Sequence, residues 1–76
     1  MKEVKITDEF IKLDQFLKYI SIAGTGGHAK YLISEGHIEV NGHIVLQRGK
    51  KIRPGDIVKI KIEEEHLFNV FKVIKD

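Results

Sequence analysis

Residues 37–46 read His-Ile-Glu-Val-Asn-Gly-His-Ile-Val-Leu, and this stretch decides the fold. Polar and apolar side chains alternate from His37 to Val40, which is the period of a half-buried β-strand, and an extended apolar run resumes at residues 43–46 after Asn41-Gly42. A two-residue loop between paired strands needs positive φ at both positions, and Asn and Gly tolerate that conformation best. The stretch therefore predicts a tight β-hairpin, with strands at residues 37–40 and 43–46.

A first helix is predicted before the hairpin. Apolar residues recur at positions i, i+3, i+4 and i+7, which is one stripe of a helix. They are Leu13, Phe16, Leu17 and Ile20. We expect this helix to end at Ala23-Gly24.

A second helix is predicted between the first helix and the hairpin. The Thr25 hydroxyl can accept a bond from a first-turn N–H, and Gly36 suits the position just past the last turn. The inner face is predicted to hold Ala29, Leu32 and Ile33. The opposite face, which is left for water or a partner, holds Gly27, Lys30, Tyr31 and Ser34.

Strands are predicted at both ends of the chain. Val4-Lys5-Ile6 alternates, and Phe10-Ile11 is a second short extended piece. Residues 53–56, Arg-Pro-Gly-Asp, form a tight turn because Pro fixes φ and Gly permits the reversal. Strands follow at residues 57–62 and 67–74. This order predicts an α+β fold, with two short helices packed on a small antiparallel sheet.

Length and composition limit the possible functions. A chain of 76 residues predicts one domain, residues 1–76, with little room for the walled pocket of an enzyme. The absence of cysteine excludes disulfides and thiolate metal sites. No apolar run approaches the ~20 residues of a membrane span, and residues 1–5 lack an apolar signal core. We expect a soluble, cytoplasmic, non-catalytic protein.

The central part of the chain resembles S4-like RNA-binding domains. Residues 12–17 are similar to their opening helix, and residues 25–36 to their second helix. Residues 37–42 resemble the hairpin motif G-x-I-x-V-N-G, and residues 52–58 the closing turn and strand V-x-P-G-D-x-I. The match covers roughly residues 12–60, most of the chain, and the combined spacing is specific. Because little lies outside this unit, the chain looks like the small stand-alone members of the family.

The resemblance implies a function and a partner. Members of the family bind structured RNA, so ribosomal or tRNA-like RNA is the expected partner. A ribosomal subunit is a further expected partner. The resemblance also implies a role in ribosome assembly or translation, with no cofactor, and we expect a monomer. Many members carry Arg just after the capping residue of the second helix and contact RNA with it. Gly26 stands there in this chain, followed by Gly27, as in the stand-alone subgroup.

The start of the second helix is one candidate RNA-binding site. Unpaired N–H groups and the helix dipole attract anions there, and glycine lets a phosphate approach the backbone closely. The predicted site consists of the Gly26 and Gly27 amides with Lys30, flanked by Lys12 and the basic loop at residues 48–53, and His28 lies near the same helix end. In the alternative interpretation, the glycine pair only makes a tight turn between the helices.

The loop after the hairpin is a second candidate. The net charge is only +2, but the bases Arg48, Lys50, Lys51 and Arg53 have no acid between them, whereas acids gather at residues 63–65. Lys and Arg side chains at this density suit an RNA backbone. The alternative is an ordinary solvated loop.

Tyr31 is a candidate for stacking on an unpaired base, because it lies beside Lys30 on the predicted outer face. The alternative is a residue at the edge of the core.

The sequence leaves two other function classes open, an enzyme such as a hydrolase built at a dimer interface and a protein–protein module. A protein–protein module would pair a partner strand with an exposed sheet edge, and the apolar strand at residues 67–74 is the candidate edge. Metal binding is not expected, because His28, His37, His43 and His66 lack ligand spacing and cysteine support. His37 and His43 flank the Asn-Gly turn and are expected to face each other.

Overall fold

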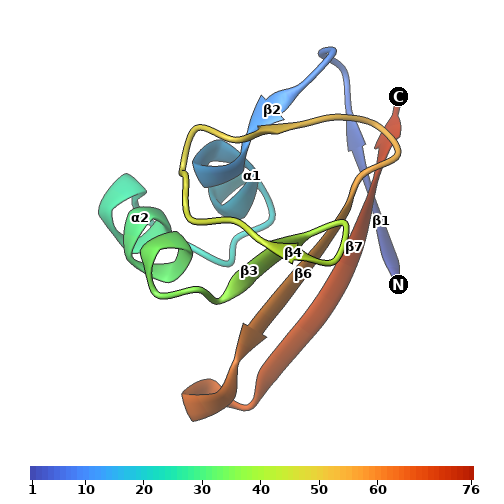
Figure 1. Ribbon diagram of the computed structural model, residues 1–76. Helices are drawn as coiled ribbons and strands as arrows, with labels where there is room; N and C mark the ends of the chain where they lie inside the picture. Colours follow the sequence, from blue (N-terminus) through green and yellow to red (C-terminus); the bar gives the residue numbers. More distant parts are fainter.

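The computed structural model describes residues 1–76 (Figure 1). Its elements are, in chain order, β1 (Lys2–Ile6), β2 (Ile11–Lys12), α1 (Leu13–Tyr19), α2 (Gly26–Ser34), β3 (Ile38–Val40), β4 (His43–Ile44), β5 (Lys51–Ile52), β6 (Ile57–Ile62), a 3₁₀ turn η1 (Glu63–Glu65) and β7 (Leu67–Lys75). The two helices lie on one face of the main sheet (Figure 1). This confirms the predicted α+β class.

The main sheet has five strands in the order β1-β7-β6-β3-β4, and β2 and β5 form a separate two-stranded ribbon. β3 pairs antiparallel with both β4 and β6, and β6 pairs antiparallel with β7, as predicted. β1 runs parallel to β7, so the sheet is mixed. The two strands lie at opposite ends of the sequence, and a connection that long permits parallel pairing.

The position of β7 corrects one sequence-based expectation. The C-terminal strand was the candidate exposed edge, but β7 lies between β6 and β1. β1 covers residues 71–75 of β7, so only residues 67–70 keep one unpaired side. The edge strands of the sheet are β1 and β4.

The Asn-Gly hairpin forms as predicted. Asn41 and Gly42 have φ of 52° and 85°, and Val40 pairs with His43 across the turn. The second strand is shorter than predicted, because β4 ends at Ile44. The expectation that His37 and His43 face each other was wrong, since Val40 is the partner of His43. The His37 ring instead lies 3.0 Å from the Lys61 carbonyl through Nδ1.

The first helix ends earlier than predicted. It stops at Tyr19 rather than at Ala23-Gly24, and Ser21 takes a left-handed φ of 63°. The Ser21 and Ile22 amides donate to the carbonyls of Lys18 and Leu17, which is the Schellman pattern of a helix end. The chain then buries Ala23 in the core, and this burial favours leaving the helix early.

The second helix has the predicted ends. Thr25 Oγ1 accepts a 3.0 Å bond from the His28 amide. Gly36 has φ of 81°, and the Gly36 and His37 amides donate to the carbonyls of Ile33 and Leu32.

Neither helix has the length and apolar character needed to cross a bilayer.

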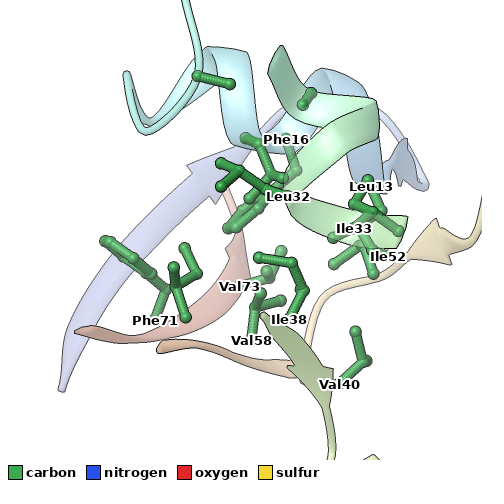
Figure 2. Close-up of a cluster of buried hydrophobic side chains, with 14 of the residues drawn as sticks. Leu13, Phe16, Leu32, Ile33, Ile38, Val40, Ile52, Val58, Phe71 and Val73 are labelled. Carbon is green, nitrogen blue, oxygen red and sulfur yellow. The ribbon is translucent and has the colours of Figure 1, made fainter. Parts of the chain in front are cut away.

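The core lies between the helices and the sheet. Every buried residue is apolar, and Figure 2 shows side chains from both layers meeting there. The inner face of α2 buries Ala29, Leu32 and Ile33, as predicted. Phe16 of α1 meets Phe71 of β7 edge to face, with ring centroids 6.2 Å apart. This packing sets the place of α1, and α1 in turn positions the candidate site.

Candidate nucleic-acid interface

Lys12 lies directly opposite Lys51 in the ribbon of β2 and β5. The two strands pair antiparallel, with Ile11 opposite Ile52 and Lys12 opposite Lys51. Ile52 is fully buried, and side chains alternate along a strand, so both lysines lie on the solvent side. The fold therefore brings Lys12 to the basic loop, residues 48–53, although Lys51 lies 39 positions further along the sequence.

Phe10 lies under two of the loop cations. Lys51 Nζ is 4.8 Å from the centroid of the Phe10 ring, and the Arg53 guanidinium carbon is 5.9 Å from it. Both distances are within cation–π range. We call the surface formed by the half-buried Phe10 and the exposed Lys12, Arg48, Lys50, Lys51 and Arg53 the basic face.

The loop is held against the start of α1 by its backbone. The Leu13 amide donates to the Lys50 carbonyl at 2.8 Å, and the Asp14 amide donates to the Arg48 carbonyl at 3.0 Å. Lys12 provides no side-chain cap for α1, so these loop carbonyls satisfy first-turn N–H groups that would otherwise be unpaired. The two bonds fix where Arg48 and Lys50 leave the backbone.

No acid neutralises the basic face. Lys12, Arg48, Lys50, Lys51 and Arg53 are all exposed, and none is in an ion pair, since the single pair joins Lys61 to Glu63 at 3.5 Å. The Asp56 carboxylate near Arg53 is occupied by the turn, where it accepts from the Arg53 amide at 2.8 Å. Like charges placed directly opposite each other destabilise a strand pair. Fold stability therefore does not explain this arrangement of exposed cations.

Gly26 and Gly27 form the first turn of α2 rather than the turn between the helices. Their amides have no partner within the protein, in contrast to the bonded amide of His28. Neither residue has a positive φ, and a Cβ at Gly26 would have no neighbour within 4 Å. The alternative interpretation was a glycine pair required by a tight turn, and this geometry does not support it. The interhelix turn uses Ser21 instead.

The other predicted residues of α2 are exposed. His28, Lys30 and Tyr31 all face solvent, and 58% of Tyr31 is accessible. No hydrogen bond or ion pair joins these residues to the basic loop, but α2 and the loop both contact α1. The structure thus assembles the basic face from Lys12 and the loop, with the start of α2 as a separate surface on the neighbouring helix.

Phe10 was not among the predicted site residues. Ile11 beside it packs against the core, and side chains alternate along an extended chain, so Phe10 lies on the other side of the chain together with Lys12. Its partners, Lys51 of β5 and Arg53 just after β5, come from a distant segment, so the cation–π contacts appear only in the folded chain. No three His, Cys, Asp or Glu side chains gather as a metal site would require.

Comparison with known proteins agrees with this architecture. The family model of the S4 domain matches residues 4–67. The chain is 40% identical over 58 residues to the probable ribosome maturation protein RlbA of Bacillus subtilis (strain 168), covering 76% of this chain and 82% of that protein.

Ribosomal proteins are also similar. The small ribosomal subunit protein uS4 of Kosmotoga olearia is 38% identical over 50 residues, 66% of this chain and 24% of that protein. The uS4 of Synechocystis sp. is 39% identical over 51 residues, 67% of this chain and 25% of that protein. The chain thus spans about a quarter of the length of these ribosomal relatives. The extent of the family match and the similarity to RlbA show that this chain belongs to the S4 domain family.

Proposed function

We propose that this chain is a non-catalytic, monomeric protein that binds structured RNA through phosphate contacts on the basic face. The observation that carries the proposal is the cross-strand pair of Lys12 and Lys51, exposed and without an acidic partner. Phosphates supply the missing negative charge, and their binding releases counterions. The Gly26 and Gly27 amides, with Lys30 nearby, would add a second phosphate contact.

The names of the relatives indicate the class of RNA. One relative is described as a ribosome maturation protein and the others as small ribosomal subunit proteins. We therefore propose ribosomal or tRNA-like RNA as the partner, with a role in ribosome assembly or translation in the cytoplasm. Folded RNA is recognised mainly by shape and backbone contacts, and a rigid basic face suits such recognition.

The test is RNA affinity measured at several salt concentrations. For roughly four phosphate contacts at ~0.7 each, log K should fall with log salt with a slope of magnitude about 3. Replacing Arg48, Lys50, Lys51 and Arg53 by Ala should weaken binding to every RNA and flatten this slope. An unchanged affinity would refute the assignment.

A matched control separates local from overall charge. Alanine at Lys2, Lys5, Lys61 and Lys72 removes the same charge from exposed positions outside the basic face. This control should retain most of the affinity. Equal losses in the two variants would mean that net charge alone governs binding.

A second candidate function is binding of a protein strand, now at β4 rather than at β7. β4 is an edge strand, its Ile44 is 61% exposed, and Leu46, two residues further along the chain, is 63% exposed. Exposed apolar side chains at a free edge favour pairing with another chain. Such binding would change little with salt, in contrast to phosphate binding.

A further inference from the structure

A hollow of about 240 Å³ opens where β1, β2 and α1 meet. In Figure 1 this is the region of the turn that joins β1 to β2, beside α1. Its volume lies below the ~300–1,000 Å³ of pockets for drug-sized ligands, so it suits a single small ring system. It is lined by Ile6, Thr7, Asp8, Phe10, Ile11 and Tyr19.

The wall of the hollow is held by three hydrogen bonds from distant parts of the chain. The Tyr19 hydroxyl donates to the Lys5 carbonyl at 3.0 Å, and the Asp76 amide donates to the Ile6 carbonyl at 3.0 Å. Lys75 Nζ donates to the Thr7 carbonyl at 2.8 Å. Three successive carbonyls are thus tied down, so the hollow is formed before any ligand arrives and little ordering is needed on binding.

The lining offers two aromatic rings to a planar ligand. Phe10 and Tyr19 both border the hollow, and Tyr19 is 60% exposed while its hydroxyl is anchored. Unpaired RNA bases are commonly bound by stacking on such rings. Planar, aromatic chemistry therefore matches this hollow better than a flexible aliphatic ligand does.

Phe10 also connects the hollow to the basic face. The same ring that borders the hollow carries Lys51 at 4.8 Å and Arg53 at 5.9 Å. A nucleotide has an anionic phosphate at one end and an aromatic base at the other. Cations next to an aromatic hollow match this arrangement, because the cations suit the phosphate and the hollow suits the base.

Asp8 is the one charged residue that lines the hollow. Its side chain is exposed, takes part in no ion pair and lines the hollow. A carboxylate accepts hydrogen bonds only. Guanine presents two adjacent donors, N1–H and the 2-amino group, whereas uracil presents one N–H between two carbonyl oxygens that a carboxylate repels.

We propose that this hollow receives a single unpaired guanine of the bound RNA, with its phosphate on Lys51 and Arg53. Phe10 and Tyr19 contact the faces or edges of the base, and Asp8 accepts from its two donors. This inference rests on the proposed RNA-binding function and adds base selectivity to it. The hollow recognises one nucleotide, whereas the basic face contacts the backbone of any RNA.

The experiment uses RNA hairpins that are identical except for one unpaired nucleotide, which is G, A, C or U. Affinities are measured for the wild type, Asp8→Asn and Phe10→Leu. We expect the wild type to prefer G over U by about tenfold, as one bidentate contact typically provides. Asp8→Asn should abolish that preference, and Phe10→Leu should weaken binding of the G hairpin by about tenfold.

Two control variants match these changes at the far end of the molecule. Glu64→Gln removes an exposed acid in η1, and Phe68→Leu removes an exposed ring in β7. Figure 1 places η1 and the start of β7 at the end of the molecule opposite to the turn between β1 and β2. Both controls should retain the preference for G. Asp8→Asn changes an exposed side chain, so it tests the idea even if Phe10→Leu fails to fold.

The outcomes separate the two proposals. If the wild type binds all four hairpins equally, or if Asp8→Asn keeps the preference for G, the guanine site is wrong while salt-dependent RNA binding stands. If no hairpin binds even at low salt, the proposed RNA-binding function itself fails. A preference for G that Asp8→Asn abolishes and both controls retain supports the site.

Discussion

The side-chain amide of Asn41 donates a 3.0 Å hydrogen bond to the carboxylate of Asp56, which ties the two tight turns of the molecule together. Asn41 also accepts a 2.9 Å bond from the Ile57 amide, and Asp56 accepts a 2.8 Å bond from the Arg53 amide. One side-chain pair thus links the hairpin at residues 41–42 to the turn that ends the basic loop. The position of Arg53 on the basic face depends on this link.

Replacing Asn41 should destabilise the protein through two separable effects. Asn41→Gly keeps the positive φ but loses two side-chain hydrogen bonds, so the free energy of unfolding should fall by about 1–3 kcal/mol. Asn41→Ala should lose about 1–2 kcal/mol more, because its φ of 52° is unfavourable for alanine. Urea unfolding measures both values, with Asn69→Ala as a control without side-chain hydrogen bonds. Equal stability of the Gly and Ala variants would contradict the role of φ.

Replacing the glycines of α2 should separate stability from binding. Gly26→Ala and Gly27→Ala should each stabilise the protein by about 0.4–1 kcal/mol, because φ is not positive and neither Cβ would be crowded. Gly36→Ala is the matched control and should destabilise it, because φ there is 81°. If phosphate approaches the two amides, phosphate titration should shift the NMR signals of residues 26–30 in the wild type and less in the double variant. Absence of any shift in the wild type would remove this surface from the proposed site.

Tyr31 should contribute to RNA binding without contributing to stability. The residue is 58% exposed, so Tyr31→Leu should change the free energy of unfolding by no more than about 0.5 kcal/mol. If the ring stacks on an unpaired base, RNA affinity should fall by about 1–3 kcal/mol. Phe68→Leu, at another exposed ring, serves as the control. Normal RNA binding by Tyr31→Leu would show that the ring is only a surface residue.

The core should depend strongly on Phe16. This side chain is fully buried and meets Phe71 edge to face, so Phe16→Ala should cost about 3–5 kcal/mol. That is a large part of the ~5–15 kcal/mol that stabilises a native protein, so thermal unfolding should occur far below that of the wild type. Phe68 is 59% exposed, so Phe68→Ala should change stability by no more than about 0.5 kcal/mol. Similar melting temperatures for the two variants would contradict the placement of Phe16 in the core.

The sequence predicts which residues of the candidate site are exposed, but not which of them lie side by side. Exposure of Lys30 and Tyr31 followed from the 3.6-residue period, because burying Ala29, Leu32 and Ile33 turns the other face outward. The period says nothing about which distant segment lies beside a residue. Neither the pairing of Lys12 with Lys51 nor the hollow beside Phe10 was therefore predicted.

The sequence by itself determined the local elements. Asn41-Gly42 specifies its turn, Thr25 and Gly36 bound α2, and Pro54-Gly55 specifies the reversal before β6, because each signal acts between neighbouring residues. Tertiary structure alone decided the parallel pairing of β1 with β7, the early end of α1 at Ser21 and the assembly of the basic face. These depend on how the whole apolar core packs, which sets the partners of segments far apart in the chain. Local turn chemistry holds no information about them.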